Sequence, residues 1–139
     1  WATRLGRVQR MQVTDGPDRI TMAITHAAGM AAADADAQAI LCCTRSGRTA
    51  RAMARFRPTA RLIGLSPTIE TARQLAVCWG VLPLTVDVYD TTDELVWFAV
   101  ERAVNASHLR PGDQVIVLAG APDRRSTAAT DVLRIVTVE

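Results

Sequence analysis

A short polar loop carries the densest group of side chains that could bind a ligand. It follows a stretch that predicts a buried strand and precedes one that predicts a helix, and its residues are Thr44, Arg45, Ser46, Gly47, Arg48 and Thr49. In open α/β sheets ligands bind at the carboxyl ends of strands, and a helix start offers unpaired N–H groups and a positive dipole end. The hydroxyls add donors, the glycine permits close backbone approach, and the guanidinium groups add charge-assisted hydrogen bonds. The loop therefore predicts a phosphate-binding site, with an ordinary Ser/Thr-capped helix start as the alternative.

Arginines gather around this loop. Six of the sixteen lie within residues 45–61, and Arg48, Arg51 and Arg55 share one helical face, which suits a solvated surface or a subunit contact. Arg124 and Arg125 lie in a second loop, after the fourth predicted strand. If the first and fourth strands are neighbours, the two loops converge and a guanidinium could close over a bound ligand; the alternative is a plain surface loop.

The basic side chains are all arginine, and the absence of lysine excludes several kinds of chemistry. A Walker-type phosphate loop, a Schiff-base enzyme and a pyridoxal-phosphate site each need the lysine amine. Arginine stays charged and holds carboxylates or phosphates with a rigid fork of donors. The composition therefore favours binding over bond-making.

Other kinds of site lack a signal. No Ser/His/Asp or Cys/His group and no metal-ligand spacing can be proposed, so we predict no catalytic residue and no metal site in this chain. A net charge of +2 and 4% aromatic residues argue against nucleic-acid binding. No apolar run approaches the roughly 20 residues that span a bilayer, which argues against membrane insertion. Three cysteines without a CxxC pair favour the cytoplasm, where we expect them in the core.

Helical and strand periodicities alternate along the chain. Helices are predicted at residues 20–33, 48–56, 67–79 and 93–107, and strands at 37–43, 61–65, 81–86, 114–119 and 132–138. Ser66 and Pro67 are expected to start the third helix, and Thr91 with Glu94 forms a capping box before the fourth. Trp79 and Trp97 are expected to be core or interface anchors.

This order predicts an α/β fold. Alternating strands and helices form a mostly parallel sheet with helices on both faces, a three-layer sandwich. The last two predicted strands have only a loop between them, so the fifth should be an antiparallel edge strand. Residues 1–19 show no clear period and begin with Trp1, so we expect a linker from a preceding domain there and one domain at residues 20–139.

The motifs SGRTAR at residues 46–51, FRP at 56–58, GVLPL at 80–84 and GDQVIVLAG at 112–120 stand in this order along the chain. Over Ile20 to Glu139 the chain resembles the C-terminal domain of bacterial pyruvate kinase. The resemblance implies a five-stranded α/β sandwich whose last strand is antiparallel. It also implies an allosteric effector site at residues 44–49, part of the contacts of a tetramer, and a catalytic barrel upstream that holds the phosphoenolpyruvate, nucleotide, magnesium and potassium sites.

The resemblance leaves the effector open. Members that bind fructose bisphosphate usually have a glycine-rich loop after the fourth strand, whereas this chain reads APDRRSTAATD at residues 121–131. A sugar monophosphate or AMP is equally compatible. Two other interpretations remain: a sugar-isomerase-type domain, which uses a similar S-x-S-G-x-T loop, and an assembly domain with a vestigial effector site. On the preferred interpretation, this chain alone binds without catalysis.

Overall fold

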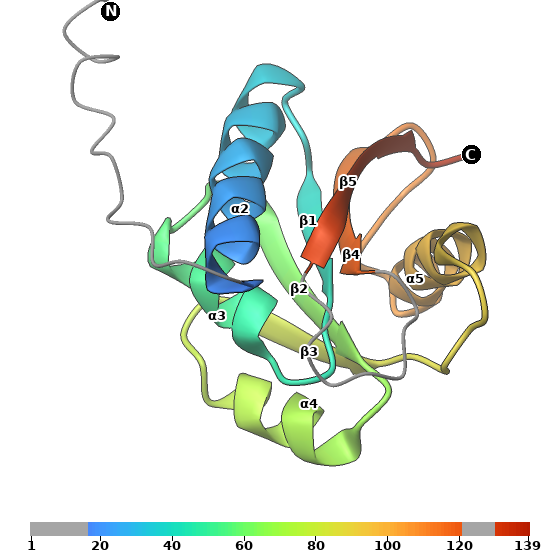
Figure 1. The fold of residues 1–139 in the computed structure, drawn as a ribbon. Helices are drawn as coiled ribbons and strands as arrows, with labels where there is room; N and C mark the ends of the chain where they lie inside the picture. The colour runs from blue at the N-terminus through green and yellow to red at the C-terminus, as the bar shows by residue number, and fades with distance from the viewer. Residues whose placement is uncertain (1–16, 121–129) are drawn as a thin grey trace, which may run out of the picture.

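The computed structural model describes residues 17–120 and 130–139, and it shows alternating helices and strands (Figure 1). The helices are α2 (Pro17–Asp34), α3 (Arg48–Arg55), α4 (Ile69–Ala76) and α5 (Thr92–Asn105). The strands are β1 (Ala39–Cys43), β2 (Arg61–Ser66), β3 (Val81–Thr85), β4 (Gln114–Gly120) and β5 (Thr130–Thr137). The predicted linker at residues 1–19 lies mostly outside the described residues.

The strands form one five-stranded sheet in the order β3-β2-β1-β4-β5. The pairs β1–β2, β2–β3 and β1–β4 are parallel, and β4–β5 is antiparallel. The central strand β1 reads AILCC and is buried along its whole length, as expected for a strand covered on both faces. The α/β class and the antiparallel fifth strand are thus confirmed.

The helices cover both faces of this sheet and divide the core in two. On one face, side chains of α2, α3 and α4 pack on alternate residues of the strands, and Met53 of α3, Leu75 of α4 and Ile116 of β4 meet there. On the other face, α5 is the one helix of the described residues that packs on the sheet, through Val96, Ala99 and Ala103. Figure 1 shows α5 on the opposite side of the sheet from α2 and α3. The predicted three-layer arrangement is therefore present.

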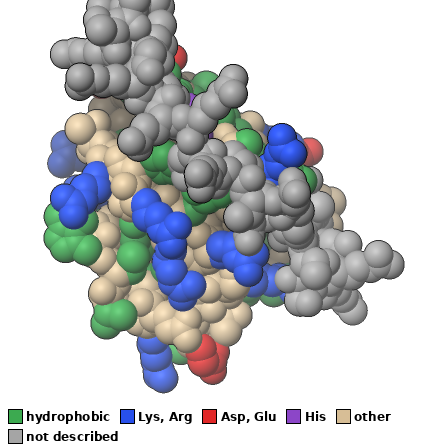
Figure 2. Space-filling view, turned by 60° about the vertical axis from the view of Figure 1, so that its left-hand side comes forward, with side chains coloured by type: hydrophobic (Ala, Val, Ile, Leu, Met, Phe, Trp, Pro, Cys, Tyr) green, Lys and Arg blue, Asp and Glu red, His purple; other side chains and the backbone are tan. Residues whose placement is uncertain are grey.

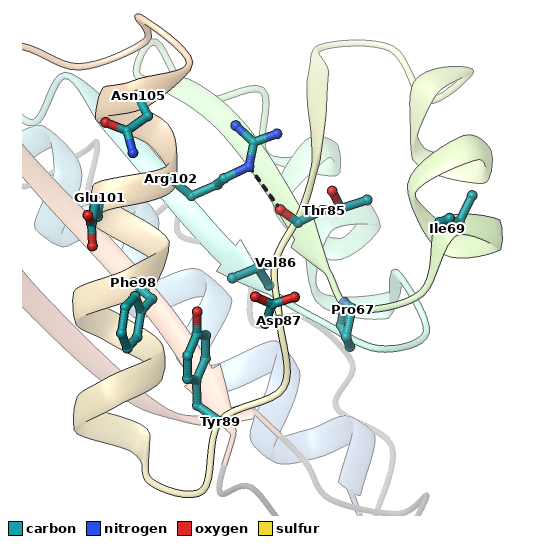
Figure 3. A pocket seen from close by; sticks show the side chains of 10 residues that line it. All are labelled: Pro67, Ile69, Thr85, Val86, Asp87, Tyr89, Phe98, Glu101, Arg102 and Asn105. Atoms are coloured by element: carbon teal, nitrogen blue, oxygen red, sulfur yellow. Dashed lines mark hydrogen bonds between the residues drawn. The ribbon is translucent and has the colours of Figure 1, made fainter.

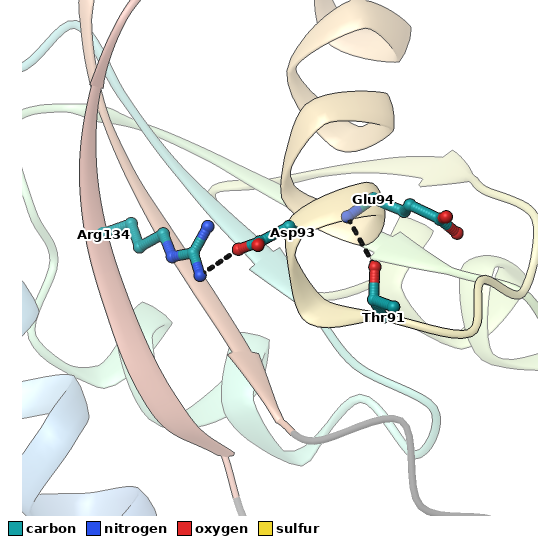
Figure 4. Close-up of polar contacts among 4 residues, drawn as sticks. All are labelled: Thr91, Asp93, Glu94 and Arg134. Atoms are coloured by element: carbon teal, nitrogen blue, oxygen red, sulfur yellow. Dashed lines mark hydrogen bonds and ion pairs between the residues drawn. The ribbon is translucent and has the colours of Figure 1, made fainter.

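The third predicted helix is shorter than the sequence indicates. Ser66 is the buried last residue of β2, and its Oγ accepts the Thr68 N–H at 3.2 Å, so Thr68, not Ser66, is the N-cap of α4. The helix ends at Ala76, and turns lead to Gly80, whose φ of 81° suits glycine. By contrast, Thr91 caps α5 as predicted, because its side chain accepts the Glu94 N–H at 3.2 Å (Figure 4).

Two expectations about apolar side chains need adjustment. Trp79 is 76% exposed and Trp97 is 60% exposed, so neither belongs to the core, and a role at an interface stays a prediction. Cys42 and Cys43 are buried as expected, whereas Cys78 is only partly buried. Trp97 lies edge-on to Phe98, and Trp79 lies beneath the guanidinium of Arg57, so both rings pack on neighbours at the surface.

Candidate functional site

The predicted phosphate loop lies at the carboxyl edge of the sheet, between β1 and α3. The Thr44 N–H donates to Leu65 O at 2.9 Å, which continues the β1–β2 pairing one residue beyond the strand. The chain then turns through residues 45–47, and the first helical hydrogen bond joins Arg51 N–H to Gly47 O at 3.0 Å. The loop therefore starts from a fully buried strand and ends at a helix amino terminus, as the sequence predicts.

Two hydroxyls of the loop accept backbone N–H groups within it. Thr44 Oγ1 accepts the Gly47 N–H at 3.0 Å, and Ser46 Oγ accepts the Arg48 N–H at 3.3 Å. These bonds satisfy donors at the start of α3 and fix the loop's shape. Each hydroxyl keeps its own proton, which can be donated to an anion. Thr44 is buried and Ser46 is exposed, so Ser46 is the better placed to touch a ligand.

Gly47 permits the turn that enters α3. Its φ is 84°, in the left-handed region that side-chain-bearing residues rarely adopt. A Cβ at this position would lie 3.2 Å from Arg51 Nη2 and 3.3 Å from Leu75 Cδ2. The backbone angle therefore favours glycine, and a Cβ would in addition be in tight contact with Arg51 and Leu75.

Helix α4 holds the loop from the side, a feature that the sequence did not indicate. Thr71 Oγ1 donates to Arg45 O at 2.6 Å, and the Thr71 side chain is buried. One turn further along, Arg51 Nη2 donates to Gln74 Oε1 at 3.1 Å. Thr71 is 26 residues from Arg45, and a threonine in an amphipathic helix has no local pattern that would reveal such a contact. Thr71 is a positioning residue for the loop.

The charge around the loop is positive. Arg45, Arg48, Arg51 and Arg55 are all exposed, the last three on the solvent side of α3. Figure 2 shows several arginine side chains on this side of the molecule, with few carboxylates in view. The alanine and Met53 side chains on the opposite side of α3 are buried in the core. The helix thus exposes arginines beside a loop of hydroxyl and N–H groups, and this combination suits an anion.

The second predicted loop follows β4, the strand beside β1. Strands β1 and β4 are neighbours, with Cys42 paired to Leu118, so the chain leaves both strands at the same edge. The sequence analysis expects the two loops to converge if these strands are neighbours, and that condition is met. Arg124 and Arg125 lie outside the described residues, and their place near the ligand stays a prediction.

The cysteine thiols and the possible metal ligands among the described residues do not form a second candidate site. Burial raises the pKa of the Cys43 thiol to about 12, and burial with the neighbouring Cys43 raises that of Cys42 still further. Both thiols therefore stay protonated and are poor nucleophiles or metal ligands. Within residues 17–120 and 130–139, no group of three or more His, Cys, Asp or Glu side chains is placed to hold a metal ion. No helix in those two stretches is long and apolar enough to cross a membrane.

Fold and loop together define an α/β domain with a candidate anion site at the carboxyl edge of its sheet. Comparison with known proteins agrees with the sequence resemblance: residues 22–136 match the family model described as pyruvate kinase, alpha/beta domain. The chain belongs to this family.

Among curated relatives, it is 41% identical over 109 residues to the pyruvate kinase of Clostridium acetobutylicum, covering 78% of this chain and 23% of that protein. It is 41% identical over 85 residues to the pyruvate kinase of Staphylococcus saprophyticus, covering 61% of this chain and 14% of that protein. With the Staphylococcus aureus pyruvate kinase, identity is 38% over 98 residues, or 70% of this chain and 17% of the relative. The chain thus spans less than a quarter of the length of these relatives.

Proposed function

We propose that this chain is the regulatory domain of a pyruvate kinase and that it binds the phosphate of a small effector at residues 44–49. The observation that carries the proposal is the loop's geometry. An exposed Ser46 hydroxyl and the exposed Arg45 and Arg48 surround the amino end of α3. The backbone there is held by Thr44, Gly47 and Thr71. A preorganised loop binds an anion without the entropic cost of ordering it.

The effector in this proposal is a sugar phosphate or AMP. Its phosphate accepts hydrogen bonds from the loop, and Arg124 or Arg125 closes over it from the segment after β4. Effector binding changes how subunits of a tetramer pack, and the active population of the enzyme shifts with it. Family membership argues against the isomerase-type alternative.

Catalysis is assigned to a part of the enzyme outside this chain. There, phosphate passes from phosphoenolpyruvate to ADP in glycolysis, in the cytoplasm, with magnesium and potassium at a barrel domain. The described residues of this chain do not fit a metal site, as noted above. On this proposal the chain alone binds an effector but does not turn over substrate.

The loop can be tested by titrating the chain calorimetrically with glucose 6-phosphate, ribose 5-phosphate, fructose 1,6-bisphosphate and AMP, with glucose as the control that lacks phosphate. Arg48→Ala should weaken binding roughly tenfold or more, because it removes a charge-assisted donor. Ser46→Asp should abolish binding by placing a carboxylate against the phosphate. Arg110→Ala is the matched control, since it removes the same charge from the exposed turn before β4.

Two results would contradict the proposal. One is that none of the four phosphates binds the unchanged chain. The other is that Arg48→Ala and Arg110→Ala bind equally well. A vestigial site in an assembly domain is recognised separately by sedimentation, because its oligomeric state would be indifferent to every phosphate tested.

A further inference from the structure

A hollow of about 490 Å³ lies beside α5, on the opposite face of the sheet from α3. We call it the α5 hollow, and its lining includes Pro67, Asp87, Tyr89, Phe98, Glu101 and Arg102. Figure 3 shows its two sides: α5 carries Phe98 and Glu101, and the segment after β3 carries Asp87 and Tyr89. None of these residues belongs to the phosphate loop, so the hollow is a separate feature of the same sheet edge.

One wall of the α5 hollow is aromatic. Tyr89 and Phe98 are stacked, with ring centroids 4.2 Å apart and an interplanar angle of 4°. The indole of Trp97 meets the Phe98 ring edge-on, with centroids 4.8 Å apart. Both stacked rings are only partly buried, and together with Val86 and Pro67 they give the hollow an apolar surface. Aromatic faces of this kind attract cations as well as apolar groups.

The charges at the hollow are mainly negative. Asp87 and Glu101 are exposed carboxylates on its two sides. Arg102 also lines the hollow and keeps its positive charge while its Nε donates to Thr85 O at 3.2 Å, so the lining carries two carboxylates and one guanidinium. Partial desolvation and then the carboxylates of Asp87 and Glu101, with a smaller contribution from Glu94, raise the pKa of Tyr89. The phenol therefore stays protonated and lies in a negative potential.

We infer that the α5 hollow binds a small organic cation, an ammonium or amidinium group attached to a flat apolar body. The body packs on the Tyr89 and Phe98 wall, and the cationic group lies between the carboxylates of Asp87 and Glu101. Carboxylates accept hydrogen bonds from such a group, and the nearby ring faces add cation–π attraction. An anion of the same shape is repelled. The hollow is thus mainly negative, whereas the arginine-flanked loop on the other face is positive.

The inference is tested with two probes of nearly the same shape and opposite charge, benzamidinium and benzoate. Each is titrated into the ¹⁵N-labelled chain, and amide shifts are followed by NMR. We expect benzamidinium to shift the amides of Tyr89, Phe98 and Glu101 in a saturable way, and benzoate to leave them unchanged. Equal shifts with both probes, or none with benzamidinium at millimolar concentration, would overturn the inference.

Matched variants locate the cation. Glu101→Gln and Asp87→Asn should each weaken benzamidinium binding roughly threefold, and Phe98→Leu, which keeps an apolar wall but removes the ring, by a similar factor. Asp34→Asn is the control, because it removes one exposed negative charge at the end of α2. If Glu101→Gln and Asp87→Asn both behave like Asp34→Asn, the carboxylates do not bind the cation and the inference fails. Arg48→Ala should leave benzamidinium binding unchanged, which separates this result from the fate of the phosphate site.

Discussion

Gly47 is the residue whose backbone angle most directly determines the shape of the phosphate loop. Gly47→Ala should lower the free energy of unfolding by about 1–2 kcal/mol, because alanine pays to adopt a positive φ. The new Cβ would also press on Arg51 and Leu75. Gly47→Ala should also lower the affinity for phosphate, since it displaces the N–H groups at the start of α3. Chemical denaturation and calorimetric titration measure the two effects.

A second glycine provides the control for this substitution. Gly29 lies within α2, and a Cβ there would meet nothing within 4 Å. Gly29→Ala should therefore stabilise the chain by roughly 0.5–1 kcal/mol through helix propensity. If both alanine variants changed stability in the same direction, the strain assigned to Gly47 would be wrong.

Between elements, the hydrogen bond from Thr71 to Arg45 O joins α4 to the phosphate loop. Thr71→Val keeps the shape of the side chain but leaves that carbonyl without its donor, so stability should fall by about 1 kcal/mol. Thr71→Ser restores the hydroxyl and should recover phosphate affinity. Calorimetric titration of phosphate into both variants shows whether affinity depends on the Thr71 hydroxyl, which positions the loop, or only on the packing of the side chain. If the valine variant bound phosphate as tightly as the unchanged chain, α4 would have no part in the site.

Much of the element order could be read from local patterns. The short apolar run ending in Cys43, the glycine-containing loop and the Thr91 cap each carry their signal within a few residues, and the sequence predicts all three. The predicted end of the third helix is wrong, because turn residues 77–79 are all apolar and extend the apolar stretch that begins at Leu75. The exposure of Trp79 could not be predicted, since burial depends on which elements surround a ring in space.

The candidate sites differ in the same way: one is visible in the local sequence, and the other depends on contacts between distant segments. The loop at residues 44–49 is contiguous, so the sequence predicts its place between a buried strand and a helix start, and its role in binding phosphate stays a prediction. The α5 hollow joins residues from segments that follow two different strands with residues from α5, and the sequence offers no spacing that would bring Pro67, Asp87 and Phe98 together. The anchoring by Thr71 is hidden for the same reason. Long-range contacts of this kind need the fold first.

Across the whole molecule, the two faces of the sheet differ in charge. Arginines are exposed on α3, whereas α5 and the segment before it expose Asp87, Asp93, Glu94 and Glu101. Asp93 also forms an ion pair with Arg134 of β5, which links the start of α5 to the edge of the sheet (Figure 4). Both partners of this pair are largely exposed, so its contribution to stability is small, about 0–1 kcal/mol. The two proposed sites depend on this difference in charge, with an anion at the arginine-flanked loop and a cation at the α5 hollow.

The position of β1 at the centre of the sheet predicts an order of folding. Ala39 pairs with Arg61, 22 residues away, and with Val115, 76 residues away. Loop-closure entropy makes the longer connection costlier by about 1 kcal/mol. In pulse-labelled hydrogen exchange during refolding, the Thr44 amide, bonded to Leu65 O, should gain protection before the Gln38 amide, bonded to Gln114 O. Simultaneous protection of the two amides would contradict this order.

The same central strand has a consequence for the chain as it is synthesised. The loop at residues 44–49 leaves the ribosome before β2 and β3 and can fold with them as they emerge, whereas β4 begins only about 65 residues after the loop. Until then, one long side of β1 has no neighbour to accept its hydrogen bonds. A nascent chain paused before residue 114 would therefore present an open strand edge to chaperones, and the edge of the sheet between β1 and β4 forms only once β4 has been added.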